Sequence, residues 1–359
     1  MILQLYILRQ VVFTLCVFLG GIAFVIFPAV AVSAITRLGG VNVKAVLGYL
    51  PLAGMDVLPY LLPMGFLLAL TSAYGRLAAD NEWTAIQMAR RNPYKLLLPA
   101  LLVAVVFSAG TYHLLATVRP EFKYEQRVYA KRAIVDTFKD LNPGRTELAF
   151  GDFYLHAARR PAKDTFGEVL IQMPGDDDRP DLRIVADRAR FTFTEIELAV
   201  EFTGARIVSG QDDLVAEYSE LRRPLEDIFE EEAYAREAGK YFTLAELRRR
   251  LADPEVRAGL SESRIKQYRY ELNQRPAFAL SFVLFVFFGA PIGLMLRRGT
   301  RLAAMTAAVG VAFAYYLGSL RLGKQLAKVS TVDPALAVWV TNIVGLVIGL
   351  YLTWRAMRR

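Results

Sequence analysis

Apolar residues along the chain fall into six long runs, which are separated by short polar segments and one long polar stretch. Each run carries at most one acidic or basic side chain. Each is also long enough to cross a bilayer, which requires about 20 apolar residues in a helix. The pattern predicts membrane-spanning helices at residues 11–36, 45–75, 96–118, 276–296, 302–320 and 334–354.

The long polar stretch, residues 119–275, divides the runs into two groups of three. We therefore expect an N-terminal transmembrane half (1–118), an inserted domain with connecting helices (119–275) and a C-terminal transmembrane half (276–359). A single basic residue, Arg9, precedes the first run, which is longer than the usual apolar core of a signal peptide, about 7–15 residues. We expect this run to be a span that is not cleaved off.

The inserted domain contains segments rich in β-branched and aromatic residues. Polar and apolar positions partly alternate at 147–157, 167–173 and 182–209, which is typical of half-buried strands. Turn-forming residues separate these segments: Asn142-Pro143-Gly144, Pro174-Gly175-Asp176 and Ser209-Gly210. The pattern predicts antiparallel strands in a sheet, a sandwich or an open barrel.

The end of the inserted domain has a helical pattern instead. Thr243 and Glu246 match a capping box, which predicts a helix at 243–252 that stops at Pro254. A second helix is expected at 261–274, and it leads almost directly into the fourth span.

Composition narrows the class of protein. The chain has 359 residues, of which 54% are hydrophobic and 22% charged, and this combination indicates a membrane protein with one sizeable soluble part. The net charge is +8, but many basic residues flank apolar runs, so we expect no nucleic-acid partner. The single cysteine, Cys16, excludes an intrachain disulfide.

Basic residues in the short loops predict the orientation, because cytoplasmic loops carry an excess of Lys and Arg. With the N-terminus in the cytoplasm, the inner set is the larger one: Arg9, Arg76, Arg90, Arg91, Lys95, Arg297, Arg298, Arg301, Arg355, Arg358 and Arg359. The outer set is Arg37, Lys44, Arg321, Lys324 and Lys328. Both termini are therefore expected in the cytoplasm and the inserted domain outside, which in a bacterium is the periplasm.

Catalytic and metal-binding patterns are missing from the sequence. Two histidines and one cysteine cannot form a His/Cys metal site, and there is no H-E-x-x-H or G-x-S-x-G motif. Gly323-Lys324 is not followed by Ser or Thr, so the chain has no phosphate-binding loop of its own. We expect neither an enzyme nor a bound cofactor or metal.

A few residues within the spans stand out. An acid inside a span is by default a functional candidate, but Pro51 and Gly54 suggest that the second span starts near Met55 and leaves Asp56 at the outer interface. His113 is expected near that interface too. Two pairs of glycines spaced four apart predict close helix contacts: Gly289 with Gly293, and Gly345 with Gly349.

Between the second and third spans, residues 74–95 predict a short amphipathic helix at 80–91. Asp80 or Asn81 is suited to cap it, Glu82 complements the positive end of its dipole, and Asn92-Pro93 stops it. Trp83 and Ile86 give an apolar stripe, and Arg90 and Arg91 suit its last turn. Two interpretations stay open: a helix resting on the lipid surface, and a docking element that a cytoplasmic partner contacts.

The whole chain resembles the LptF/LptG family, the permease subunits of the lipopolysaccharide-export ABC transporter. The most specific segments are LLPMGFLLALTSAYGRLAADNEWTAIQMAR at 61–90, YELNQRPAFALSFVLFVFFGAPIGL at 270–294 and DPALAVWVTN at 333–342. Within them, Glu82 takes the place of the family's acid that engages the ATPase, and Glu271 and Arg275 precede the fourth span. Arg90-Arg91-Asn92 departs from the family, whose members usually have a glycine and a small residue there. Glu271 and Arg275 favour the LptF type, although the LptG type stays open.

The resemblance implies a function and a set of partners. The fold is expected to be six transmembrane helices with an inserted periplasmic β-jellyroll-like domain. The implied partners are a second permease of the same family, a cytoplasmic ATPase dimer that uses ATP, a single-span periplasmic bridge protein and lipopolysaccharide, all at the cell inner membrane. The ATPase-coupling candidates are Asp80, Glu82, Trp83, Ile86, Arg90 and Arg91.

The outer basic residues fit the same interpretation. Arg37, Lys44, Arg321, Lys324 and Lys328 are expected at the height of the lipid headgroups, where Lys and Arg pair strongly with phosphate. Ordinary anchoring at the interface is the alternative.

Two other classes of protein remain as competitors. A permease of the lipoprotein-releasing type predicts four spans with the external domain after the first. A membrane sensor or scaffold with a periplasmic binding domain leaves the helix at 80–91 without a role.

Overall fold

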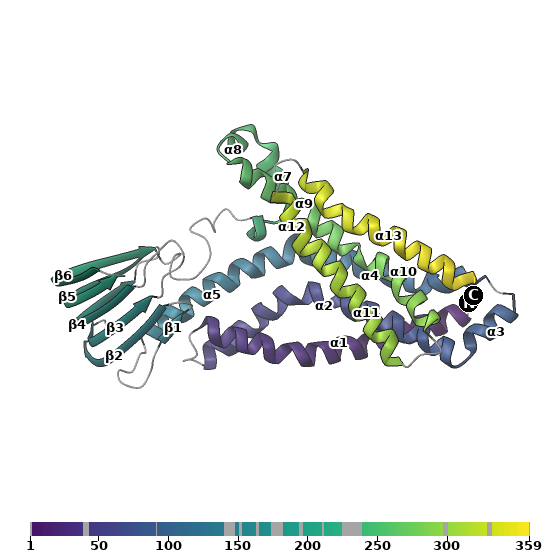
Figure 1. Ribbon diagram of the computed structural model, residues 1–359, viewed down its shortest axis with the longest axis horizontal. Helices are drawn as coiled ribbons and strands as arrows, with labels where there is room; N and C mark the ends of the chain where they lie inside the picture. Colours follow the sequence, from purple (N-terminus) through teal and green to yellow (C-terminus); the bar gives the residue numbers. More distant parts are fainter. Residues whose placement is uncertain are drawn as a thin grey trace. The chain divides into compact units, whose positions relative to one another are not determined.

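The computed structural model describes residues 2–38, 43–90, 92–139, 148–150, 153–162, 165–173, 182–193, 197–209, 212–224, 239–296, 301–328 and 332–358. The chain forms two compact units (Figure 1). The helical unit comprises Met1–Phe27, Met55–Lys123 and Ala238–Arg359, and the β unit comprises Pro28–Gly54 and Tyr124–Glu237.

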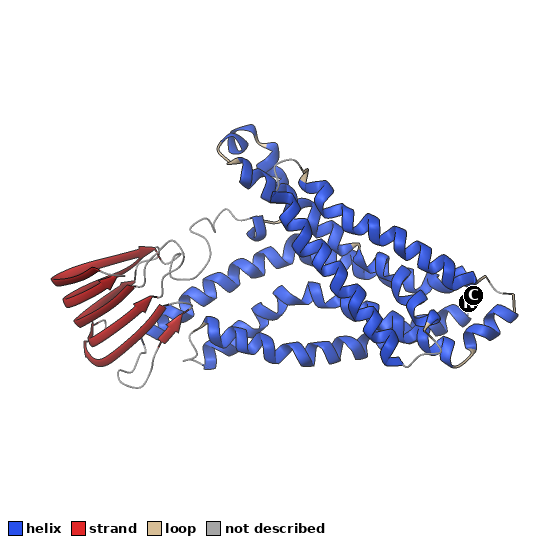
Figure 2. Ribbon diagram, viewed as in Figure 1, coloured by secondary structure: helices blue, strands red, loops and turns tan. Residues whose placement is uncertain are grey.

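Six helices in the described part of the chain are long and apolar enough to cross a membrane, as the hydrophobic pattern predicts (Figure 2). The first two are single helices, α1 (Ile2–Arg37) and α2 (Val43–Ala79). The third span starts with η1 (Pro93–Leu97) and α4 (Leu98–His113). The fourth joins α9 (Glu262–Ala279) to α10 (Ser281–Met295). The fifth and sixth comprise α11 (Arg301–Tyr316), η5 (Leu317–Leu322), α12 (Gly323–Lys328) and α13 (Pro334–Arg358).

The third helix extends well beyond the apolar run that predicted it. After α4, the chain continues through a π-helical turn, η2 (Leu114–Val118), into α5 (Arg119–Lys139). Hydrophobicity marks only the part of a helix that faces lipid or core, whereas α5 is a polar helix rich in good helix formers. Its existence was missed for that reason.

The two helices expected before the fourth span are confirmed. Helix α7 (Leu244–Ala252) starts with the predicted capping box: the Glu246 backbone N–H donates to the Thr243 hydroxyl, and the Thr243 N–H donates to the Glu246 carboxylate. A short helix, α8 (Pro254–Ala258), and then α9 follow, and α9 begins at the Ser261 cap.

The core of the helical unit is built around α10, where Phe282, Phe285 and Val286 are 0% exposed. Small residues bring α10 close to α2, since a Cβ on Gly293 would lie 2.5 Å from the Thr71 carbonyl oxygen. A Cβ on Gly289 would lie 2.7 Å from the Leu70 Cβ, and one on Gly349 would lie 2.9 Å from the Phe287 Cβ. The close helix contacts predicted from the glycine spacing are confirmed at these positions.

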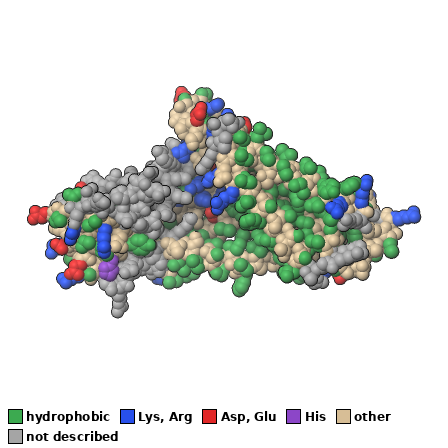
Figure 3. All heavy atoms as spheres, viewed as in Figure 1, with side chains coloured by type: hydrophobic (Ala, Val, Ile, Leu, Met, Phe, Trp, Pro, Cys, Tyr) green, Lys and Arg blue, Asp and Glu red, His purple; other side chains and the backbone are tan. Residues whose placement is uncertain are grey.

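Large apolar side chains also cover much of the face of the helical unit that Figure 3 shows. Phe13, Phe24, Leu302, Phe313 and Val347 are all exposed. In a soluble protein such a surface would be a liability, but it suits contact with lipid chains or with another membrane helix.

The inserted part forms an antiparallel sheet, as predicted. The described strands are β1 (Leu148–Phe150), β2 (Phe153–Ala162), β3 (Thr165–Met173), β4 (Leu182–Phe193), β5 (Glu197–Ser209) and β6 (Asp212–Pro224). Each pairs with the next, in the order β1-β2-β3-β4-β5-β6. The strand β6 was not expected, and the turns predicted at 142–144, 174–176 and 210 lie outside the described residues.

The sheet order refines the expected architecture. A helical membrane protein with an inserted β domain is confirmed. Among the described strands, those adjacent along the chain are adjacent in the sheet, and each pair is antiparallel.

One face of the sheet is apolar because alternate residues point to the same side. Leu155 pairs with Ile171, which pairs with Ile184, and all three are buried. These side chains belong to one core with Ala133 of α5 and with residues at the ends of α1 and α2. There the Tyr129 hydroxyl on α5 donates to the Ala45 carbonyl (3.1 Å).

Candidate functional site

The first candidate site is the helix between α2 and η1, which is shorter than the sequence predicts. It is α3 (Glu82–Met88), instead of residues 80–91. Asn81 precedes it with a left-handed backbone (φ 58°), and Arg90 after it is also left-handed (φ 52°). The predicted side-chain cap from Asp80 or Asn81 is wrong, because no side chain caps α3. Asn92 instead caps η1, by accepting from the Tyr94 N–H (3.0 Å).

The two faces of α3 differ sharply. Trp83 and Ile86 are 3% and 9% exposed and lie in the core of the helical unit, which also includes Leu77, Leu96 and Leu97. Met88, in contrast, is 80% exposed. Asp80 and Arg90 are also exposed, and Arg91 lies outside the described residues. The apolar stripe therefore attaches α3 to its own chain, and the other face is accessible.

Glu82 lies at the start of α3 and is partly exposed. Its carboxylate accepts a hydrogen bond from the Tyr6 hydroxyl of α1 (3.1 Å). The acid is thus positioned by another helix and is still open to solvent, so a partner can reach it.

The predicted headgroup residues belong to different parts of the chain. Arg37 ends α1 and Lys44 is exposed in α2, and both belong to the β unit. Arg321 in η5 and Lys324 in α12 are exposed, and Lys328 ends α12; these three belong to the helical unit. The side chains of Arg37 and Lys328 lie outside what the structure describes.

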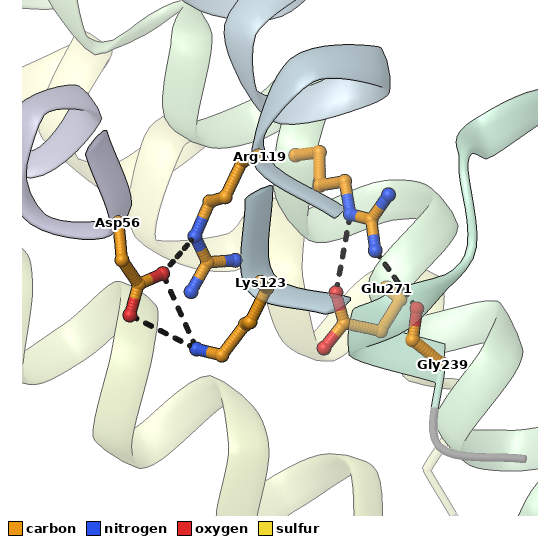
Figure 4. Close-up of polar contacts among 6 residues, drawn as sticks. Asp56, Arg119, Lys123, Gly239 and Glu271 are labelled. Carbon is orange, nitrogen blue, oxygen red and sulfur yellow. Dashed lines mark hydrogen bonds and ion pairs between the residues drawn. The ribbon is translucent and has the colours of Figure 1, made fainter. Parts of the chain in front are cut away.

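The second candidate site is a charged cluster in the helical unit (Figure 4). The Asp56 carboxylate accepts from Nε of Arg119 (2.8 Å) and pairs with Nζ of Lys123 (3.1 Å). The Arg119 guanidinium also lies over the Tyr60 ring, 5.2 Å from its centroid. Asp56 is on α2 and both bases are on α5, so the ion pairs fasten these helices together.

The same cluster contains a fully buried arginine. Arg275 on α9 is 0% exposed, and its Nε donates to the Glu271 carboxylate (3.2 Å). Its other nitrogens donate to two backbone carbonyls, Nη1 to Phe242 (2.8 Å) and Nη2 to Gly239 (2.9 Å). Arg119 lies within electrostatic range of both Glu271 and Arg275. We call Asp56, Arg119, Lys123, Gly239, Glu271 and Arg275 the charged collar.

Sequence reasoning missed most of the charged collar. The second helix begins at Val43 and not near Met55, so Asp56 lies inside it and needs partners. The isolated acid in an apolar run was the usable signal. Arg119 and Lys123 are four residues apart and therefore on one face of a helix, but that helix was not predicted.

The described histidines and acids were compared with the requirements of a metal site. Within the described ranges, no group of three His, Cys, Asp or Glu side chains is placed to hold a metal ion. His113 on α4 and His156 on β2 are both exposed.

These features define a multi-pass helical membrane protein, with a β domain inserted between its third and fourth spans. The chain belongs to the LptF/LptG family, described as lipopolysaccharide export system permease LptF/LptG, which matches residues 5–355. It is thus a transmembrane permease component of lipopolysaccharide transport. No curated protein matches the chain. The competing lipoprotein-releasing type predicted four spans, which the six long helices contradict.

Proposed function

We propose that this chain is a permease subunit of an ABC transporter that extracts lipopolysaccharide from the outer leaflet of the inner membrane. The lipid then passes to a periplasmic bridge protein. The observation that supports this proposal is the family match over residues 5–355, which covers both transmembrane halves and the inserted β domain.

The proposed energy source is a separate ATPase. Removing acyl chains from a bilayer costs about 0.8 kcal/mol per CH₂. Binding alone cannot supply this free energy in every transport cycle, so an external energy source is needed. The chain has no phosphate-binding loop of its own, so we assign ATP hydrolysis to a pair of cytoplasmic subunits and propose no enzymatic role or cofactor for this chain. A second permease of the family completes the membrane part.

The proposed orientation places both termini and α3 in the cytoplasm and the sheet in the periplasm. The excess of basic residues in the loops expected inside supports it. In this orientation α3 is the surface that the ATPase contacts. Burial of Trp83 and Ile86 fits a helix that is firmly attached to the helical unit, so that its movement is shared with the spans.

The experiment that tests the proposal is purification of the tagged chain in mild detergent, with mass spectrometry of the proteins and lipids that co-purify. We expect an ATPase, a second permease, a single-span protein and lipopolysaccharide. ATP-dependent release of lipopolysaccharide from proteoliposomes of the same complex provides the functional measurement. A complex that contains no ATPase would refute the proposal.

Replacing Glu82 tests the contact between α3 and the ATPase. We expect Glu82→Gln to weaken ATPase association about tenfold, because a hydrogen bond to a charged group contributes about 1.5–3 kcal/mol. Co-purification of the ATPase at increasing salt measures the effect.

The matched control for Glu82 is Tyr6→Phe. This change removes the internal hydrogen bond to Glu82 and leaves the carboxylate in place. Glu82→Gln should weaken ATPase association more than Tyr6→Phe does, and unchanged association in Glu82→Gln would contradict the docking role.

Neutralising Arg37 and Lys44 together tests the proposed headgroup contact. We expect the Arg37→Gln, Lys44→Gln variant to reduce photo-crosslinking of lipopolysaccharide several-fold, because each basic residue lost removes a charge-assisted bond to phosphate, worth about 1.5–3 kcal/mol. The control is Arg248→Gln with Arg249→Gln, two exposed positions on α7. Equal crosslinking in both double variants would leave ordinary anchoring as the role of Arg37 and Lys44.

A further inference from the structure

Span four is interrupted at Leu280, within the helical unit. Helix α9 ends at Ala279 and α10 begins at Ser281. Pro276 lies inside α9, and because proline has no backbone N–H it cannot donate to the carbonyl four residues before it. Backbone groups that lose their helical partners in an apolar core need other partners, since an unpaired polar group there is costly.

Three other spans supply polar side chains to this interruption. The Ser108 hydroxyl of α4 donates to the Ala279 carbonyl (2.8 Å), and the Asn342 amide of α13 donates to the Ala277 carbonyl (2.8 Å). The Tyr315 hydroxyl of α11 donates to Oδ1 of Asn342 (2.9 Å) and lies 3.4 Å from the Ala277 carbonyl oxygen. Spans three, five and six therefore meet span four through hydrogen bonds at this place.

Two further hydroxyls are buried here. Ser281 and Ser319 are 0% and 1% exposed, and both lie next to the Tyr315 hydroxyl. Neither has a hydrogen-bond partner of good geometry within the described part of the chain. A helical serine usually bonds the carbonyl four residues before it, but for Ser281 this is Ala277, which Asn342 already contacts. Burial of these two hydroxyls is therefore not offset by protein groups.

Span five departs from α-helical geometry at the same place. Ser319 lies in the π-helical turn η5, and π-helical turns within α-helices often occur at functional sites. The turn packs closely on α13, since a Cβ on Gly318 would lie 2.9 Å from Cγ2 of Thr341. The interrupted helix of span four and the widened turn of span five thus meet at the Tyr315 hydroxyl.

We propose that Ser281, Ser319 and Tyr315 bind a buried water molecule, which makes the interruption at Leu280 a hinge. A buried water makes two to four hydrogen bonds, and these three hydroxyls can supply that number. The polar groups at the interruption are neutral, so they suit water better than a metal ion or a phosphate, which usually bind charged side chains. Bonds through water are nearly as favourable as direct bonds, so α10 can bend relative to α9 without leaving these hydroxyls unpaired.

Hydroxyl-radical footprinting with X-rays tests the water in the full-length chain. The radicals form from water, so a buried tyrosine is oxidised only where a water molecule lies beside it. We expect Tyr315, which is 5% exposed, to be oxidised at a rate similar to the exposed Tyr351. The matched control is Tyr74, which is 0% exposed and donates to the Leu96 carbonyl (2.7 Å), and it should stay unmodified.

Replacing both serines distinguishes a hydrated site from a dry one by the sign of the stability change. If water bonds both hydroxyls, Ser281→Ala with Ser319→Ala loses these bonds. We then expect the melting temperature of the detergent-solubilised chain to fall by about 2–4 °C, and the oxidation of Tyr315 to stop. In a dry site, alanine would remove two unpaired polar groups and raise the melting temperature. The control is Ser263→Ala, an exposed position on α9, which should change neither measurement.

Hydrogen–deuterium exchange of the same chain tests the hinge. We expect the backbone amides of residues 277–284 to exchange faster than those of 285–294, the following turns of α10. In the double alanine variant, exchange of the two segments should become similar. Equal exchange in the wild-type chain would overturn the hinge. An unmodified Tyr315, or a higher melting temperature of the double variant, would overturn the water site.

Discussion

Replacing Trp83 with alanine is expected to detach α3 from the helical unit. The indole is 3% exposed in the core, and removing such a side chain costs about 3–5 kcal/mol. A helix of seven residues has little stability of its own. Once the Trp83 contacts are lost, we therefore expect the whole segment between α2 and η1 to lose its ordered structure. We expect rapid proteolysis between residues 76 and 95, and loss of ATPase co-purification.

The control for Trp83 lies on the opposite face of α3. Met88 is 80% exposed, so Met88→Ala should leave the proteolysis rate unchanged. It should reduce ATPase association only if the accessible face of α3 is the docking surface. Wild-type resistance to proteolysis in Trp83→Ala would contradict the anchoring role of the buried stripe.

The second large effect is expected at the contact of α2 with α10. A Cβ on Gly293 would lie 2.5 Å from the Thr71 carbonyl oxygen and 2.7 Å from the Gly75 nitrogen. Both atoms belong to the backbone and cannot rotate away, so Gly293→Ala has to separate the two helices. We expect the free energy of unfolding to fall by about 3 kcal/mol, near the upper end of the range for overpacked cores. The melting temperature of the detergent-solubilised complex measures this loss.

Gly310→Ala provides the comparison for Gly293. Gly310 lies in α11, and a Cβ there would meet no atom within 4 Å. Alanine is the better helix former by up to about 1 kcal/mol, so this variant should melt at the same temperature or slightly higher. Equal melting temperatures for the two alanine variants would show that α2 and α10 are not closely packed.

Much of the fold follows from hydrophobic pattern alone. Six apolar runs predict six helices, and the capping box at Thr243 fixes the start of α7, because both signals are local. Helix α5 and strand β6 were missed for a related reason. Both are rich in charged residues, and a pattern of apolar positions marks only surfaces that are buried.

The candidate sites were less predictable. The sequence predicts where α3 lies and that Trp83 belongs to its apolar face. Whether that face packs against the chain's own helices, against lipid or against a partner can be seen only from the tertiary contacts. Asp56 stands out in the sequence, but its partners could not be predicted, because Asp56 and Lys123 are far apart in sequence and meet only through the packing of α2 with α5. Gly239 and Arg275 are likewise brought together by the fold.

The sequential order of the strands has a consequence for biogenesis. Each described strand finds its partner in the next segment to be synthesised, so closing each hairpin costs little chain entropy. Pairing can therefore advance hairpin by hairpin as the chain emerges, before the last three hydrophobic helices are made. Translation order and sheet order coincide, so the open edge of each strand from β2 to β5 is covered as soon as the next strand is made, which shortens the time for which it invites aggregation.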